Sequence, residues 1–184
     1  MAKITNIITQ DIGQVVELMR PLDYTLVNVD GDQSEMPYYI FGRRLEISNR
    51  LTEKNLDRVY MFKKYPLVAL RLNVPEERNN GVITYNLNIG IFAFTDKETN
   101  SEERIEKVFK PILYPMYERF IYALRRSGLF MWEGDQSEPP HTKIDIPFWG
   151  LSGSEGNTKY IFSDPLDCIE IQNLQIKQRI TNCK

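Results

Sequence analysis

The chain has 184 residues, of which 42% are hydrophobic and 11% aromatic, and its formal net charge at pH 7 is −2. A chain of this length can form one domain with a buried core, and its composition is ordinary for a globular protein. The near-neutral charge argues against a protein whose main task is to grip phosphate backbones, since such domains usually carry a basic excess.

The first element is predicted to be an amphipathic helix over about residues 3–20, because its apolar residues follow helical spacing until Pro21 ends the pattern. Short strands are expected at 24–30 and 38–41, on either side of a polar loop. A second, short helix is expected over 45–55, where leucine and isoleucine again recur on one side.

Two strands are predicted in the middle of the chain, at 66–72 and 82–95, and we expect them to pair antiparallel. The intervening segment, 73–81, is expected to form a turn, because it contains proline, asparagine and glycine. The second strand alternates polar and apolar residues, which is typical of a half-buried strand. Its apolar face comprises Ile83, Tyr85, Leu87, Ile89, Ile91 and Ala93.

A long helix is predicted from about 102 to 127, where Gly128 ends it. Pro111 and Pro115 lie inside this pattern, and a proline in a helix interior costs roughly 3 kcal/mol or more. We therefore expect the helix to be broken or bent at Pro111 and Pro115, with one short helical turn before Pro111 and a helix that restarts near it, with proline in the first turn.

Three more strands are expected near the C-terminus, at 142–150, 158–162 and 168–178. No stretch rich in glycine, proline or serine divides the chain, so residues 1–184 are predicted to form a single domain with a C-terminal β-hairpin extension, about 142–178. The fold class is α+β: a mainly antiparallel sheet, with the N-terminal helix and the long proline-kinked helix packed on it.

The sequence Gly-Asp-Gln-Ser-Glu occurs twice, at 31–35 and 134–138. Closely spaced carboxylates are the ligands of calcium loops, but neither copy has the 12-residue calcium-loop register. Glycine and aspartate followed by serine and proline are also ordinary in connectors, which favours two solvated turns over a metal site. The carboxylates that could hold a metal are Asp30, Asp32, Glu35, Glu133, Asp135 and Glu138.

The sequence gives little indication of a catalytic site or of a cofactor-binding site. The only histidine, His141, follows two prolines, so neither a Ser-His-Asp nor a Cys-His arrangement is expected. Cys168 and Cys183 are predicted to be free thiols, and we expect no cofactor. A small carboxylate-based enzyme or metal-binding protein remains one alternative, and a nucleic-acid adaptor another, because aromatic and basic residues alternate at 60–65 and 118–126.

The chain is not expected to enter or cross a membrane. Its N-terminus, MAKITNIITQDIGQ, lacks the unbroken apolar region and cleavage site of a signal peptide. No stretch approaches the roughly 20 apolar residues that span a bilayer. We therefore expect a protein that stays, or is assembled, where it is made.

A resemblance to a known family rests on two segments, FKKYPLVALRLNVPEE (62–77) and EKVFKPILYPMYERFI (106–121). They resemble signature segments of small virion proteins from tailed phages and prophages of Bacteroidetes, including crAss-like phages. In that family a K-Y-P-L strand precedes a long strand and an F-K-P-apolar-L-Y-P helix. The order of elements also resembles tail-terminator (tail-completion) and head–tail connector proteins.

The resemblance implies a structural protein without catalytic residues, located in the neck or tail of a virion and assembled in the host cytoplasm. It implies a homo-oligomeric ring, six-fold or twelve-fold, that joins portal, connector or tail proteins around a channel through which DNA passes without sequence-specific binding. Polar loops and an exposed arginine pair are then the expected contacts between subunits. The candidate interface residues are Arg43, Arg44, Asn79, Asn80, Asp96, Glu98, Ser152 and Glu155.

Overall fold

The computed structural model describes residues 7–19, 26–27, 33–34, 37–55, 64–134, 137–152, 159–160 and 164–179. Within these ranges no helix is both long and apolar enough to cross a lipid bilayer. The fold is α+β with a mainly antiparallel sheet, as the sequence predicted.

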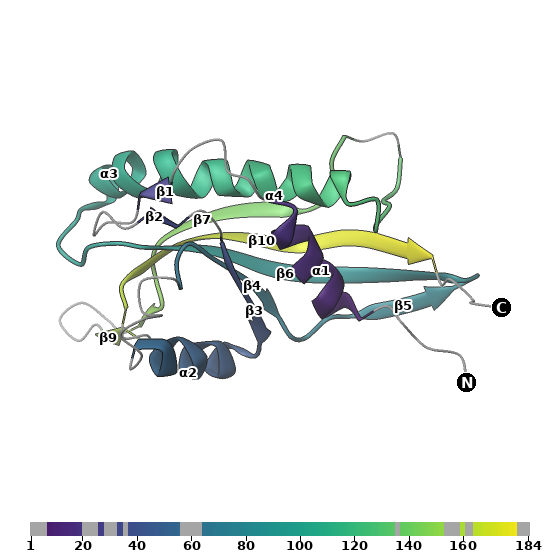
Figure 1. The fold of residues 1–184 in the computed structure, drawn as a ribbon, viewed down its shortest axis with the longest axis horizontal. Coiled ribbons are helices and arrows are strands. Elements are labelled where there is room, and N and C mark those ends of the chain that lie inside the picture. Colours follow the sequence, from purple (N-terminus) through teal and green to yellow (C-terminus); the bar gives the residue numbers. More distant parts are fainter. Residues whose placement is uncertain are drawn as a thin grey trace.

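A six-stranded sheet forms the centre of the molecule (Figure 1). Its order is β3–β4–β6–β10–β7, and β5 pairs with β6 beyond the end of β4. Only β3 and β4 run parallel; the other pairs are antiparallel. The strands are β3 Tyr38–Gly42, β4 Leu67–Arg71, β5 Glu76–Asn79, β6 Val82–Phe94, β7 Thr142–Trp149 and β10 Leu166–Arg179. Two short hairpins lie outside it, β1 Leu26–Val27 with β2 Gln33–Ser34 and β8 Leu151–Ser152 with β9 Lys159–Tyr160.

Helices cover both faces of the sheet to different extents (Figure 1). The helix face carries α1 and the long helical run, and the other face, called here the α2 face, carries α2 at one end. The helical segments are α1 Ile8–Glu17, α2 Arg44–Asn55, α3 Ser101–Arg104, η2 Ile105–Leu113 and α4 Tyr114–Arg126.

The alternation along β6 produces two separate cores. The residues predicted to be apolar and inward are all buried in the larger core on the helix face, against α1, η2 and α4. Near the end of β6 the opposite face is buried as well, because Phe92 packs on Trp149 within a core that also includes residues of α2. The smaller core on the α2 face comprises Ile40, Ile47, Leu51, Tyr65, Leu67, Ala69, Phe92, Trp149, Leu166 and Cys168.

The helix is not broken at Pro111. Residues 101–126 form one continuous helical run, and the part that contains Pro111, η2, is wound as a π-helix. The wider winding moves the carbonyl groups of the preceding turn away from the proline ring, which relieves the clash that an α-helix would impose. α-Helical winding resumes at Tyr114, so Pro115 lies in the first turn of α4, as predicted, although inside the continuous run.

The turn expected over 73–81 is also shorter than predicted. Residues Glu76–Asn79 form β5, and the reversal is confined to Asn80 and Gly81, with φ angles of 48° and 75°. Two successive positive φ angles are the mark of the tight hairpin turn that favours asparagine and glycine. The resulting β5–β6 hairpin, together with the end of β10, projects beyond the helices (Figure 1), and we call it the arm.

The strands near the C-terminus occur where the sequence places them. The segments predicted at 142–150 and 168–178 are β7 and β10, which pair antiparallel. Because β10 also pairs with β6 along most of its length, this hairpin lies within the main sheet. Of the strand predicted at 158–162, the described part is β9.

Candidate functional site

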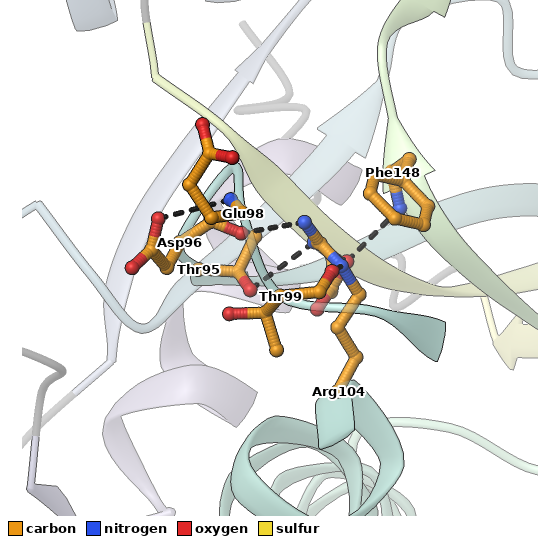
Figure 2. A network of polar contacts seen from close by, with 7 residues as sticks. Thr95, Asp96, Glu98, Thr99, Arg104 and Phe148 are labelled. Atoms are coloured by element: carbon orange, nitrogen blue, oxygen red, sulfur yellow. Dashed lines mark hydrogen bonds and ion pairs between the residues drawn. The ribbon is translucent and has the colours of Figure 1, made fainter. Parts of the chain in front are cut away.

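The most completely bonded charged group in the described structure is Arg104, whose side chain is fully buried (Figure 2). Its Nε–H donates to the carbonyl oxygen of Thr99 (2.8 Å), and Nη2 donates to that of Asp96 (2.5 Å). Nη1 donates to Oδ1 of Asp167 (2.8 Å) and to Oγ1 of Thr95 (3.1 Å). The guanidinium therefore ties the loop before α3 to strand β10.

Asp167 extends this network to the edge strand β7. Its Oδ1 also accepts the backbone N–H of Phe148 (2.9 Å), and the Arg104 guanidinium lies 3.6 Å from the centroid of the Phe148 ring. Phe148 has a φ of 56°, a conformation that costs energy in a residue other than glycine. Breaking a buried ion pair by removing one partner costs about 3–5 kcal/mol, so this network is a structural junction.

The junction fixes two of the predicted interface residues, Asp96 and Glu98. The carbonyl of Asp96 is held by Arg104, and its Oδ1 accepts the backbone N–H of Glu98 (3.1 Å). Asn100 caps the helix that follows, because its Oδ1 accepts the N–H of Glu103 (3.0 Å). Asp96 and Glu98 thus stand exposed on a loop of defined shape.

A groove of about 450 Å³ lies at the arm, on the α2 face of the sheet. It brings together Asn79, Asn80 and Glu133, which the sequence placed on different loops. We call it the arm groove. Its lining combines apolar, amide and charged side chains: Glu77, Asn79, Asn80, Val82, Thr84, Met131, Trp132, Glu133, Pro140, Gln175 and Lys177.

Glu133 is paired across the arm groove with Lys177. The Lys177 ammonium donates to Oε1 of Glu133 and lowers the pKa of that carboxyl. The two backbones also meet here, since Met131 and Lys177 form an isolated antiparallel bridge. Glu133 is thus held as the partner of a lysine.

The other candidate metal ligands are not assembled in the described residues. Glu138 is exposed, and Asp30, Asp32, Glu35 and Asp135 lie outside the ranges that the structure describes. Within those ranges no group of three or more histidine, cysteine, aspartate or glutamate side chains is arranged to hold a metal ion.

A second exposed feature, the arginine corner, consists of Arg43, Arg44 and Leu45 at the start of α2. All three side chains are exposed, and Leu45 has the largest exposed fraction, 72%, of the described large hydrophobic residues. The Arg44 guanidinium lies 5.2 Å from the Trp149 ring centroid, whereas the Arg43 side chain has no hydrogen-bond or ion-pair partner among the described residues. Leu72 lies beside this corner, because its N–H donates to the carbonyl of Gly42 (3.1 Å).

Glu170 holds the ring on which Arg44 rests. Its Oε1 accepts the indole N–H of Trp149 (3.0 Å) and pairs with Arg71, while Oε2 accepts from Gln172 (2.8 Å). Glu170 is buried, so these bonds fix the position of Trp149. Arg44 of the arginine corner therefore lies over a ring whose position is fixed.

His141 ends the connecting segment that precedes β7. Its Nδ1 donates to the carbonyl of Pro139 (2.7 Å), so Nε2 accepts from the Tyr117 hydroxyl (2.8 Å). These two bonds attach the segment before β7 to α4. The other titratable group with a catalytic precedent, Cys168, is buried and free, and burial raises the pKa of its thiol.

Ser152 and Glu155, the remaining predicted contacts, are not placed as side chains. Ser152 belongs to β8, where only its backbone is described, and Glu155 lies outside the described residues, as does Cys183.

The sequence-based prediction missed Arg104, Asp167 and Glu170. A signal for Arg104 exists: it stands four and eight residues before Val108 and Ile112, on the stripe that the helix buries. A cation on such a stripe requires a buried partner. No comparable signal marks Asp167 or Glu170: Asp167 precedes the strand predicted at 168–178, and alternation alone does not reveal that the strand face carrying Glu170 becomes covered.

Comparison with known proteins places the chain in no family. No protein-family model matches it, and no curated protein sequence matches it significantly.

Proposed function

We propose that this chain is a structural subunit that assembles with copies of itself into a ring in the neck or tail of a tailed-phage virion. In this role the ring joins portal, connector or tail proteins, and DNA passes through its channel without sequence-specific binding. The proposed ring is six-fold or twelve-fold, and no enzymatic step is part of the proposal.

The observation that supports the proposal is a contrast. The buried charged side chains have hydrogen-bond partners, whereas the arginine corner and the arm groove each expose a charged side chain that has none among the described residues. Arg104, Asp167 and Glu170 direct their charges inward, where they hold loops and strands in place. The arginine corner lies over Trp149, which Glu170 holds, and the arm groove lies at the far ends of β6 and β10; both are open to solvent. Rigid, exposed surfaces on one small domain are what a repeating assembly requires.

The sequence adds two further arguments. The segments 62–77 and 106–121 resemble those of small virion proteins, and they form β4 with its flanks and most of the π-wound and α4 helix. The net charge of −2 also suits a ring around DNA, because a strongly basic channel would retain the duplex.

Sedimentation velocity of the purified chain over a wide concentration range tests the proposal. We expect one discrete species at six or twelve times the subunit mass of 21.6 kDa, in equilibrium with smaller species on dilution. A specific contact of this kind buries more than about 1,000 Å² in total, so the species should persist in moderate salt. A chain that stays monomeric at the highest attainable concentration contradicts the proposal.

A further inference from the structure

The arginine corner has the composition of a docking element. It presents one strongly exposed leucine, Leu45, between two exposed arginines and Leu72, which is 36% exposed. Apolar anchors flanked by arginine are enriched at the centres of protein interfaces. The Arg43 side chain in particular has no hydrogen-bond or ion-pair partner within the described part of the chain.

The arm groove has the complementary composition. Val82, Met131 and Trp132 contribute apolar surface to its lining, and Glu77 and Glu133 contribute carboxylates. Lys177 neutralises Glu133, so Glu77 is the carboxylate that lacks a partner among the described residues. Its position on β5, with every residue of that strand exposed, leaves it accessible to an incoming cation.

Within one subunit the corner does not occupy the groove. None of the three corner residues lines the groove, and the Arg43 side chain pairs with no residue in the described part of the chain.

We infer that the arginine corner of one subunit docks in the arm groove of a second copy of this chain. Leu45 enters between the apolar side chains of the groove, and Arg43 pairs with the partner's Glu77. This inference rests on the proposed self-assembly and names the contact that drives it. The occupant is a second copy because both halves of the complementary pair are present on this chain.

Charge exchange between the two halves tests the inference. We expect Arg43→Glu and Glu77→Arg each to raise the midpoint concentration of assembly by roughly tenfold or more, since each places like charges opposite one another. The combined variant R43E/E77R, and an equimolar mixture of the two single variants, should both recover assembly, because each restores opposite charges at every contact. Circular dichroism should show that all variants remain folded, as both positions are exposed.

A matched control is Glu17→Arg, which makes the same charge change as E77R at an exposed position on α1, on the helix face. We expect it to assemble like the unaltered chain. If R43E and E77R also assemble normally, or if their mixture does not recover assembly, the inferred contact is wrong while the proposed ring stands. If the unaltered chain never assembles, the proposed function itself fails.

Discussion

Two arginines on opposite sides of the sheet interact with successive residues of β7, and they differ in almost every other respect. Arg104, from the helix layer, lies 3.6 Å from the Phe148 ring centroid and is fully buried. Arg44, from α2, lies 5.2 Å from the Trp149 ring centroid and is exposed. One end of a single edge strand therefore supports a closed arginine site on one face and an open one on the other.

The difference shows how burial separates a structural charge from an available one. A buried guanidinium must have hydrogen-bond acceptors for its donors, because an unpaired charge in the interior is very costly. Arg104 obtains them from a loop, a strand and a carboxylate. An exposed arginine is solvated by water and gains little from any one neighbour, so it can exchange water for a partner subunit.

The largest expected effect separates the two sites directly. Arg104→Met should lower the free energy of unfolding by about 3–5 kcal/mol, because it leaves Asp167 buried without its cation. Arg44→Met should lower it by about 1 kcal/mol or less, the value of an exposed cation–aromatic contact. Urea unfolding measures both, and equal losses would show that the two sites do not differ as described.

A smaller loss is expected at Gly90, in the middle of β6. A Cβ atom there would lie 2.4 Å from two carbons of the Phe92 ring, which itself packs on Trp149 at a centroid distance of 4.5 Å. Gly90→Ala should therefore destabilise the base of the arginine corner by roughly 1–3 kcal/mol.

The control for this prediction is the double variant Gly90→Ala/Phe92→Leu, compared in urea unfolding with Phe92→Leu alone. The smaller side chain gives way to the new methyl group, so the added cost of the alanine should shrink. An unchanged cost would assign the effect to the glycine backbone instead of the Phe92 ring.

A still smaller effect is expected at the tip of the arm. Gly81 has a φ of 75°, but no atom lies within 4 Å of the Cβ position, so Gly81→Ala adds backbone strain without a clash. The left-handed conformation costs an L-residue about 1–2 kcal/mol. Chemical denaturation should show a loss of that size, while Asn80→Gly, at φ 48°, should be close to neutral.

The smallest effect concerns Cys168 and pH. Burial raises the pKa of its thiol above the value of about 8.5 in an unfolded chain. The folded state thus retains a proton that the unfolded state releases, so stability should be full below pH ~8.5 and decline as pH rises above it. The decline should be present in Cys183→Ser and reduced in Cys168→Ala/Cys183→Ser, as measured by denaturation at a series of pH values.

The helices and strands of this fold were predicted from the sequence better than its buried polar contacts. The alternation of β6 and the apolar stripes of the helices depend on local periodicity, and those elements formed as expected. The π winding around Pro111 was not foreseen, because the sequence does not show that a helix can widen there and continue. Asp167 and Glu170 were missed because they are bonded to Arg104, Arg71 and strand β7, which are distant in the chain.

The candidate site was predicted only in part, for a similar reason. Asn79, Asn80, Arg43 and Arg44 were singled out as exposed polar residues, which turn chemistry and charge reveal. Their grouping into a groove and a corner depends on the register of β5 on β6 and on the return of residues 131–133 to the end of β10. Pairing between residues far apart in the chain produces no local sequence pattern from which it could be predicted.

Electron cryomicroscopy of the assembled chain tests the central claim most directly. The account predicts closed rings of a single subunit number, with a central opening, in which the arginine corner of each subunit meets the arm groove of the next. Monomers at every concentration, or open filaments without closure, would contradict it.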